Sequence, residues 1–205
     1  DPAPGSVREY AVADYDNDGF AENHIFGTHG WPPEAWNVYN NTLITKTSHS
    51  FGTAALALTP ASEVPWYFLN NILVQNYPEG KLFREVRMDS QALGQQIADG
   101  NIYWRAPRSD GTQSTAPLYF LFEYTDPLGA VKQVSFASIE EFRASPYFAM
   151  TQGYYPPGFD VTTRFAEPQL DAEYRPLPGS PATARLLDLS TLFPNWPENN
   201  SDYIG

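Results

Sequence analysis

A short acidic segment near the N-terminus has the residue pattern of a cation site. Carboxylates alternate at Asp14, Asp16 and Asp18, a glycine follows the third, and Glu22 stands at the ninth position of the segment. A hard cation such as Ca2+ needs several oxygen ligands that converge on one point, and glycine lets the chain turn tightly enough to supply them. We therefore predict that these four carboxylates bind Ca2+. The alternative is an acidic surface turn that holds no ion.

The acidic segment departs from an EF-hand at position twelve, where Ile25 replaces the bidentate glutamate. It more closely resembles the shorter calcium loops of the FG-GAP and thrombospondin type 3 kinds. An FG-GAP blade of a propeller would predict further copies of the acidic loop, and this sequence contains none. An EF-hand is therefore not expected. A propeller blade of the FG-GAP kind is also a weaker hypothesis than the β-helix and structural-module hypotheses given below.

Two histidines and two tryptophans follow the acidic segment, at His24, His29, Trp31 and Trp36. Histidine is the side chain whose ordinary pKa lies near neutrality, and tryptophan offers a flat apolar ring with a polar edge. We predict that these four residues line a groove that binds a sugar chain. The alternative is that the histidines are ordinary loop or core residues, and their spacing matches no zinc helix motif.

The densest group of basic residues is Lys81, Arg84 and Arg87. Because side chains alternate between the two faces of a strand, Arg84 and Arg87 would lie on opposite faces and would not act together as a proton-abstracting base. The sequence also lacks a glycine-rich phosphate loop, a Gly-x-Ser-x-Gly elbow and a dinucleotide fingerprint. We therefore name no catalytic residue, and whether the protein is an enzyme stays open.

Composition narrows the class of protein. Acidic residues outnumber basic ones 24 to 12, giving a formal net charge of −12, so nucleic acid is not an expected partner. The sequence has no Cys, which excludes disulfides and thiolate metal sites. No apolar run approaches the roughly 20 residues needed to span a bilayer. The chain begins at Asp1 without Met, and we read it as a piece of a longer polypeptide whose remainder lies upstream.

A repeat in the sequence predicts the secondary-structure elements that position these candidate site residues. Asn41, Asn71 and Asn101 are spaced 30 residues apart, each within a short apolar run, and a fixed period of this size is typical of repeat architectures. The runs are rich in β-branched and aromatic residues, which favours strands over helices. Residues 54–58 and 81–88 add further candidate strands, the second with an alternating pattern.

The asparagines have a structural explanation. A repeating chain must turn sharply at each corner, and Asn tolerates the left-handed conformation that such a corner requires. Side-chain amides from successive repeats can then form a ladder of hydrogen bonds. We favour this interpretation over a binding role for Asn41, Asn71 and Asn101.

The runs 38–44 and 68–74, with their Asn-Asn corners, resemble the right-handed parallel β-helix proteins related to pectate lyases. The later segment Leu177-Pro-Gly-Ser-Pro-Ala182 is similar to an element found near the C-terminal end of bacterial β-helix proteins, and residues 202–205 resemble the start of its closing segment. The resemblance implies an all-β fold, a right-handed parallel β-helix (solenoid). It also implies a polysaccharide as ligand.

The second half of the chain breaks the repeat, because position 131 is Val where the spacing calls for Asn. Residues 117–124 and 131–136 predict a hairpin that projects from the repeats. Ser138 and Glu141 form a capping box and predict a short helix that ends before Pro146. We expect residues 147–205, which are rich in proline, to pack along the last repeats and cover their apolar end.

These observations divide the chain into 1–105, with the acidic loop and the repeats, and 106–205, with the hairpin, helix and capping extension, as one structural unit. We expect an exported protein, secreted or at the bacterial cell surface, that binds or degrades polysaccharide as a lyase or hydrolase would. The alternative is a non-enzymatic structural or adhesion module stabilised by Ca2+. The polysaccharide assignment follows from the resemblance, since a fold alone does not establish a function.

Overall fold

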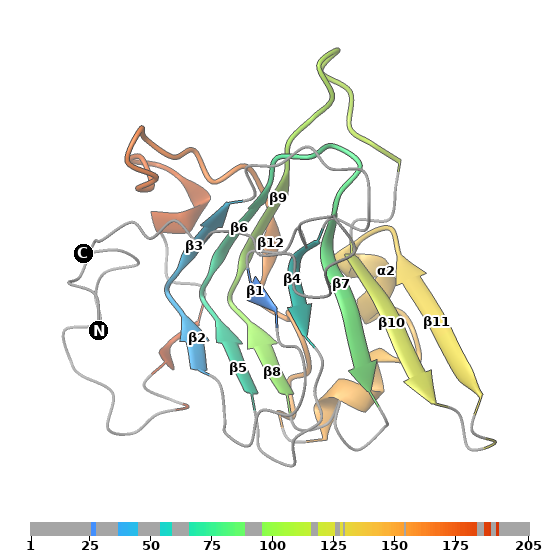
Figure 1. Ribbon diagram of the computed structural model, residues 1–205. Coiled ribbons are helices and arrows are strands. Elements are labelled where there is room, and N and C mark those ends of the chain that lie inside the picture. The colour runs from blue at the N-terminus through green and yellow to red at the C-terminus, as the bar shows by residue number, and fades with distance from the viewer. Residues whose placement is uncertain are drawn as a thin grey trace.

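A computed structural model provides the three-dimensional structure of the chain (Figure 1). The strands are β1 (Phe26–Gly27), β2 (Asn37–Tyr39), β3 (Thr42–Ile44), β4 (Ala54–Leu58), β5 (Trp66–Leu69), β6 (Ile72–Gln75), β7 (Lys81–Met88), β8 (Gln96–Asp99), β9 (Ile102–Arg105), β10 (Tyr119–Thr125), β11 (Val131–Phe136) and β12 (Arg164–Phe165). The helices are α2 (Ile139–Arg143) and the 3-10 turns η1 (Phe148–Gln152) and η2 (Pro181–Thr183). The described residues are 26–27, 37–44, 54–58, 66–88, 96–115, 119–125, 128, 130–153, 155–183, 187–189 and 192.

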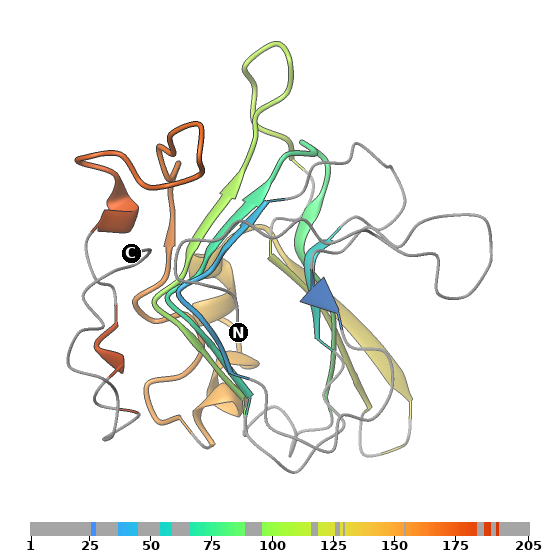
Figure 2. The ribbon, with the colours of Figure 1, turned by 60° about the vertical axis from the view of Figure 1, so that its left-hand side comes forward.

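The strands form three sheets with a regular order. The β5 sheet (β2-β5-β8) and the β6 sheet (β12-β9-β6-β3) are entirely parallel. The mixed sheet (β1-β4-β7-β10-β11) is parallel except for its last pair. Each strand from β1 to β7 pairs with the strand three places later, so the predicted mostly β fold with parallel sheets is confirmed. Figure 2 shows the β5 and β6 sheets meeting at an angle, with the mixed sheet facing them.

The 30-residue spacing is the register of β2-β5-β8 and of β3-β6-β9 in the two all-parallel sheets. Tyr67 lies beside Asn37 and Ile97, and Leu73 lies beside Leu43 and Tyr103. Equal spacing places like residues side by side, so an apolar position in one repeat packs on an apolar position in the next. Leu73 and Tyr103 are fully buried, and Leu43 is 8% exposed.

The paired asparagines have separate tasks. The first residue of each corner has a left-handed backbone, with φ of 55° at Asn40, 52° at Asn70 and 69° at Gly100. The second residue forms the ladder: the Asn71 Oδ1 accepts hydrogen bonds from the Asn41 backbone N–H (3.0 Å) and Nδ2 (3.1 Å), and the Asn101 Oδ1 accepts from Asn71 at 2.8 and 3.2 Å. The predicted left-handed corners and amide ladder are both confirmed.

The ladder continues where the sequence shows no further asparagine. The Thr163 Oγ1 accepts a hydrogen bond from the Asn101 backbone N–H at 2.9 Å. Around it, the N–H groups of Asp160, Arg164 and Ala166 donate to carbonyls of β8, the corner and β9 at 2.6, 2.9 and 3.0 Å. Residues 155–166, which we call the return segment, therefore take the place beside β8 and β9 that the repeat would give to residues near 131.

The predicted hairpin is present, but one of its strands belongs to a sheet. β10 and β11 are antiparallel, with Phe122 beside Val134. β10 is also parallel to β7, with Phe122 beside Val86, so it continues the mixed sheet instead of projecting from the repeats. The expectation of a projecting hairpin was wrong, because the backbone edge of β7 is available for parallel pairing with residues 122–124 of β10.

The short helix forms as its capping box predicts. The Ser138 Oγ accepts a hydrogen bond from the Glu141 N–H at 3.1 Å, and the Glu141 carboxylate accepts one from the Ala137 N–H. Ile139 and Phe142 bury the inner side of α2, and the Phe142 ring meets Phe136 of β11 at 5.3 Å between ring centroids.

The C-terminal residues cover the outward faces of two sheets. Ala182, fully buried in the Leu177–Ala182 element, packs with Ile72, Val74 and Ile102 of the β6 sheet. Leu189 and Tyr155 pack with Leu69 and Ile97 of the β5 sheet. Figure 2 shows this part of the chain running along the outside of both sheets. The return segment lies beside the last repeat, whereas Ala182 and Leu189 pack on the faces of the sheets.

Candidate functional site

The residues predicted to bind ligands in the N-terminal part lie outside the described residues. This applies to the four expected calcium ligands and to the four expected sugar-binding residues, which are Asp14, Asp16, Asp18, Glu22, His24, His29, Trp31 and Trp36. Their assignments stay predictions. Among the residues that the structure does describe, no three His, Cys, Asp or Glu side chains come close enough to hold a metal ion.

Asp99, at the end of β8, is a buried carboxylate with four hydrogen-bond donors. Its Oδ1 accepts from the Gly100 N–H (2.8 Å), the Thr162 N–H (2.7 Å) and the Thr162 Oγ1 (2.9 Å), and its Oδ2 accepts from the Tyr155 hydroxyl (3.0 Å). Burial and the Asp99 charge raise the pKa of Tyr155 well above its usual range. A carboxylate satisfied in this way fastens the return segment to β8 and is not placed to reach a substrate.

Asp160 joins the return segment to β9 in the same way. Its Oδ1 accepts hydrogen bonds from the Thr163 Oγ1 (2.6 Å), the Tyr103 hydroxyl (3.0 Å) and the Asn101 Nδ2 (3.3 Å). Burial, followed by the charge of Asp160, raises the pKa of Tyr103 well above its ordinary value. Arg143 of α2 donates to the backbone carbonyls of Asp160 and Thr163. Asp160 is therefore structural too.

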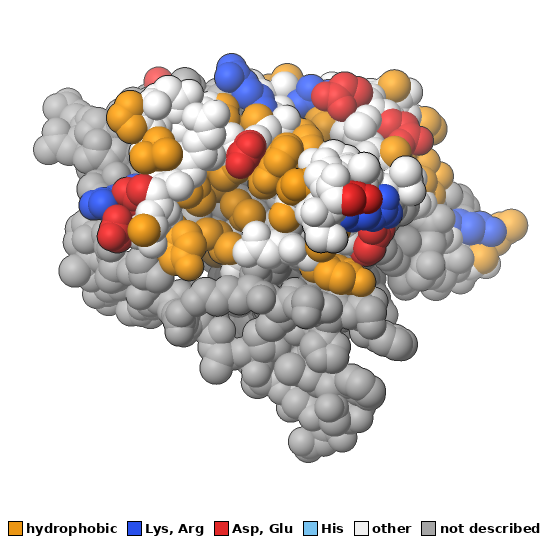
Figure 3. Space-filling model, turned by 90° about the horizontal axis from the view of Figure 1, so that it is seen from above, with side chains coloured by type: hydrophobic (Ala, Val, Ile, Leu, Met, Phe, Trp, Pro, Cys, Tyr) orange, Lys and Arg blue, Asp and Glu red, His pale blue; other side chains and the backbone are white. Residues whose placement is uncertain are grey.

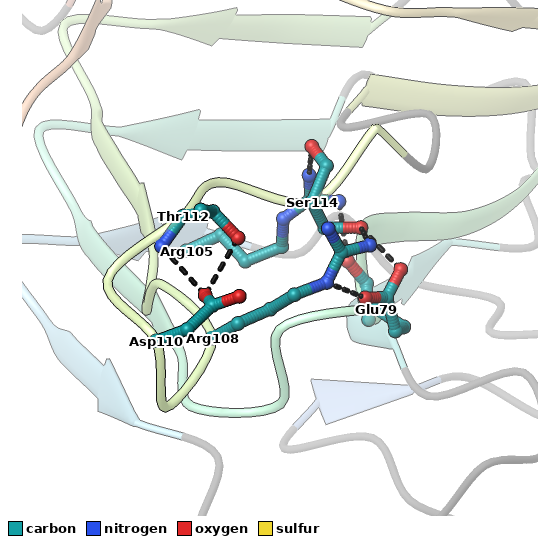
Figure 4. A network of polar contacts seen from close by, with 7 residues as sticks. Glu79, Arg105, Arg108, Asp110, Thr112 and Ser114 are labelled. Carbon is teal, nitrogen blue, oxygen red and sulfur yellow. Dashed lines mark hydrogen bonds and ion pairs between the residues drawn. The ribbon is translucent and has the colours of Figure 1, made fainter.

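Charged side chains that remain partly exposed gather where β6 and β9 end (Figure 4). The loop after β6 carries Glu79, and the loop after β9 carries Arg108 and Ser114. The Arg108 Nε donates to the Glu79 Oε1 at 2.7 Å, with 39% and 38% of the two side chains exposed, and the Ser114 hydroxyl donates to the other Glu79 oxygen. The hydrogen bond from Arg108, followed by that from Ser114, lowers the pKa of the Glu79 carboxyl.

Arg105 lies beneath this pair and supports both loops. It is fully buried, and its guanidinium donates to the Gly80 carbonyl (3.2 Å) and the Ser114 carbonyl (2.7 Å). Burial lowers the pKa of Arg105, and the charge of Glu79 partly offsets that effect. In the same loop, Asp110 accepts hydrogen bonds from the backbone N–H (2.9 Å) and hydroxyl (2.7 Å) of Thr112, which lower its pKa.

A second charged group lies in the loop after β12. The Arg175 guanidinium donates to Asp171 and to Glu173, each at 2.9 Å. The Asp171 carboxylate also accepts the backbone N–H groups of Glu173 (2.9 Å) and Arg175 (2.8 Å), and the backbone bond from Arg175 is the main cause of its lowered pKa.

Near these loops, apolar side chains that stay partly buried pack over the β6 sheet. Trp104, Ile44 and Leu170 contact its buried residues, and the Phe165 ring contacts Trp104; we call this group the edge hollow. The Trp104 and Phe165 ring centroids are 5.3 Å apart, with the rings tilted by 41°. Figure 3 looks down on the ends of these strands and shows hydrophobic side chains in a hollowed area between two groups of acidic and basic side chains.

This arrangement suits binding by contact with a flat, hydroxyl-bearing ligand. Aromatic rings offer apolar surface to the face of a sugar ring, and a few paired polar groups around an apolar floor fix orientation. Trp104 belongs to the third apolar run of the sequence, but no motif marks Arg108, Glu79 or the loop after β12 as part of a site. A signal was present in the polar residues that follow β9, but nothing in the sequence pairs position 79 with position 108.

Comparisons with protein-family models, with curated proteins and with solved structures found no significant match. Among the described helices, none has the length and apolar character needed to cross a membrane. The function must therefore be argued from the site itself.

Proposed function

We propose that this chain is part of a right-handed parallel β-helix of an exported protein and that it binds polysaccharide. Three features support the β-helix: the 30-residue register, the pairing of each strand from β1 to β7 with the third strand after it, and the amide ladder at the corners. The right hand follows from the strong preference of parallel strand connections for that hand.

The edge hollow carries the proposal for polysaccharide. Trp104 stays partly exposed beside Phe165 near the carboxyl ends of β9 and β12, and an apolar surface with a few placed polar groups is typical of ligand sites. The flanking loops are held in place by buried Arg105 and by the hydrogen bonds of Asp171. A rigid aromatic floor with fixed polar rims loses little conformational entropy when a flexible sugar chain binds.

The side chains of the described part of the chain favour binding of polysaccharide without cleavage. Asp99 and Asp160 are buried and accept hydrogen bonds from hydroxyl and N–H groups, and Glu79 is held by Arg108 and Ser114. Acid–base catalysis needs a carboxyl group within hydrogen-bond reach of the substrate. These three serve instead to hold loops and strands.

Affinity electrophoresis of the protein in gels containing different polysaccharides tests the proposal. We expect retarded migration in at least one polysaccharide gel and loss of that retardation in Trp104→Ala. Equal mobility in every gel would refute polysaccharide binding. Incubation with pectate, alginate and glycosaminoglycans, followed by absorbance of unsaturated ends, tests for a lyase; an increase would show that the protein cleaves uronate chains and overturn the binding-only form.

A further inference from the structure

We infer that the edge hollow is a subsite for polysaccharides of neutral sugars and that it discriminates against uronate chains. This inference rests on the proposed function and specifies its ligand. It is argued from the charges that surround Trp104 and Phe165.

The loops around the edge hollow carry more acidic than basic residues. In segments 76–80, 106–115 and 166–180 the basic residues are Arg108 and Arg175, and the acidic residues are Glu79, Asp110, Glu167, Asp171 and Glu173. Like charges around a binding surface repel a ligand of the same sign, and the formal net charge of −12 acts in the same direction. A chain of ionised uronates would therefore meet an unfavourable potential.

Each of the two guanidinium groups on the rims already has a carboxylate partner. Arg108 donates to Glu79 at 2.7 Å, and Arg175 donates to Asp171 and Glu173 at 2.9 Å. The bidentate recognition of a carboxylate by arginine would require a uronate to displace one of these partners. Arg105 directs its donors to the Gly80 and Ser114 carbonyls instead.

The same paired groups are suited to hydroxyls. A carboxylate oxygen that accepts one hydrogen bond still has lone pairs for a sugar O–H, and a guanidinium has five N–H donors to share. Neutral sugars supply both donors and acceptors without adding charge, and their C–H faces match the Trp104 and Phe165 rings. Both the aromatic rings of the edge hollow and the paired charged groups around it are therefore suited to a neutral sugar ligand.

Isothermal titration with matched polymers tests this inference. The probes are soluble glucan, mannan and galactan, each beside the same polymer oxidised at C6 to the uronate. We expect at least one neutral polymer to bind about tenfold or more tightly than its oxidised form at low salt, with the ratio decreasing as salt screens the charges. Uronate forms that bind as tightly as, or more tightly than, the neutral forms would overturn the inference and leave polysaccharide binding intact. Binding of neither form would refute the proposed function itself.

Variants locate the discrimination. Glu173→Gln, at an exposed position, relieves Arg175 of one carboxylate and is expected to raise the affinity for the oxidised polymer more than that for the neutral one. Trp104→Phe, which keeps an aromatic ring, is expected to weaken neutral binding severalfold, whereas Val161→Ala, at an exposed apolar position outside the hollow, leaves it unchanged. If Glu173→Gln leaves the ratio of the affinities for neutral and oxidised polymer unchanged, the inference is rejected. It is also rejected if Trp104→Phe alters sedimentation but not binding, since the edge hollow would then have another role.

Discussion

The amide ladder concentrates hydrogen bonds on a few buried residues. Asn71 is fully buried; its Nδ2 donates to the Val38 carbonyl at 3.0 Å and to the Asn101 Oδ1 at 3.2 Å. Asn101 repeats the pattern with the Phe68 carbonyl at 3.1 Å. Each amide thus satisfies the backbone of the preceding repeat at a corner, where the strand ladders are interrupted.

Asn71→Ala should therefore be strongly destabilising. The substitution removes the acceptor of two Asn41 donors and leaves the partly buried Val38 carbonyl without this partner, so we expect the free energy of unfolding to decrease by about 3 kcal/mol. Urea unfolding followed by circular dichroism measures the change. Asn41→Ala, at the exposed end of the ladder, is the matched control and should cost about 1 kcal/mol or less. Equal losses in the two variants would contradict the ladder's role.

The left-handed corner at Gly100 leaves no room for a side chain. An added Cβ would lie 2.2 Å from the Asn70 Oδ1 and 2.8 Å from the Leu187 Cβ. These two groups are themselves joined, because the Asn70 amide exchanges hydrogen bonds with the Leu187 backbone at 2.8 and 3.1 Å. The corner is therefore where the C-terminal residues are fastened to the β5 sheet.

Gly100→Ala is expected to reduce the free energy of unfolding by about 3 kcal/mol, because steric overlap adds to the cost of a left-handed alanine. Gly111→Ala provides the control, since its φ of 81° is similar but no atom lies within 4 Å of the added Cβ. That variant should lose only about 1 kcal/mol. Thermal unfolding compares the two, and a Gly100 variant as stable as the Gly111 variant would disprove the close packing.

At the level of elements, the chain leaves the repeats after β10 and comes back at the return segment. β11, α2 and η1 lie between, and the Phe136, Phe142, Phe148 and Tyr147 rings pack together with centroids 5.3–6.1 Å apart. Arg143 of α2 then donates to the Asp160 and Thr163 carbonyls. The excursion is therefore a packed unit that positions the residues completing the ladder.

Ser138→Ala tests whether α2 stabilises that unit. Loss of the hydrogen bond to the Glu141 N–H should decrease the free energy of unfolding by about 1 kcal/mol. Ser135→Ala, at an exposed position of β11, should have little effect. The comparison is made by urea denaturation, and a Ser138 variant indistinguishable from Ser135→Ala would show that the capping box contributes nothing.

For the whole molecule, the two buried Tyr–Asp pairs predict a weakness at alkaline pH. The pKa values of Tyr103 and Tyr155 are raised in the folded protein. Because the unfolded chain releases these phenolic protons near pH 10 and the folded chain retains them, their contribution to stability is complete below that pH and is lost as the pH rises. The double variant Tyr103→Phe/Tyr155→Phe should show a shallower loss of stability between about pH 9 and 11, measured by urea unfolding. A slope equal to that of the parent protein would contradict this account.

Calcium binding by the acidic segment is also a prediction about the whole protein. If Asp14, Asp16, Asp18 and Glu22 bind Ca2+ in the folded state, the melting temperature should increase on the order of 5 °C when Ca2+ is present at about 100 times its dissociation constant. Scanning calorimetry with Ca2+ and with chelator measures the shift. The variant Asp14→Asn/Asp16→Asn should abolish this shift. A melting temperature that does not change with Ca2+ would contradict calcium binding by the acidic segment.

The sequence by itself determined most of the strands, the period and the corners, but not β8 and β12. Short apolar runs, Asn pairs 30 residues apart and the Ser138 capping box act over a few residues, so their consequences follow from local backbone preferences and hydrogen bonds. Local patterns of the same kind are the basis for the predicted calcium site in the acidic segment and for the predicted roles of the His and Trp residues. These residues lie outside the described part of the chain. They carried no sign of the Glu79–Arg108 pair, because its members are 29 residues apart and meet only when successive repeats align.

Only the tertiary structure decided how the second half of the chain meets the first. Thr163 completes the ladder 62 residues after Asn101, β10 joins the mixed sheet, and Ala182 covers the β6 sheet. Contacts between distant residues depend on which buried surfaces and unpaired backbone groups remain available once the repeats have formed. The local pattern of a threonine or an alanine does not specify such a partner, so the edge hollow and its charged rims emerge only from the folded chain.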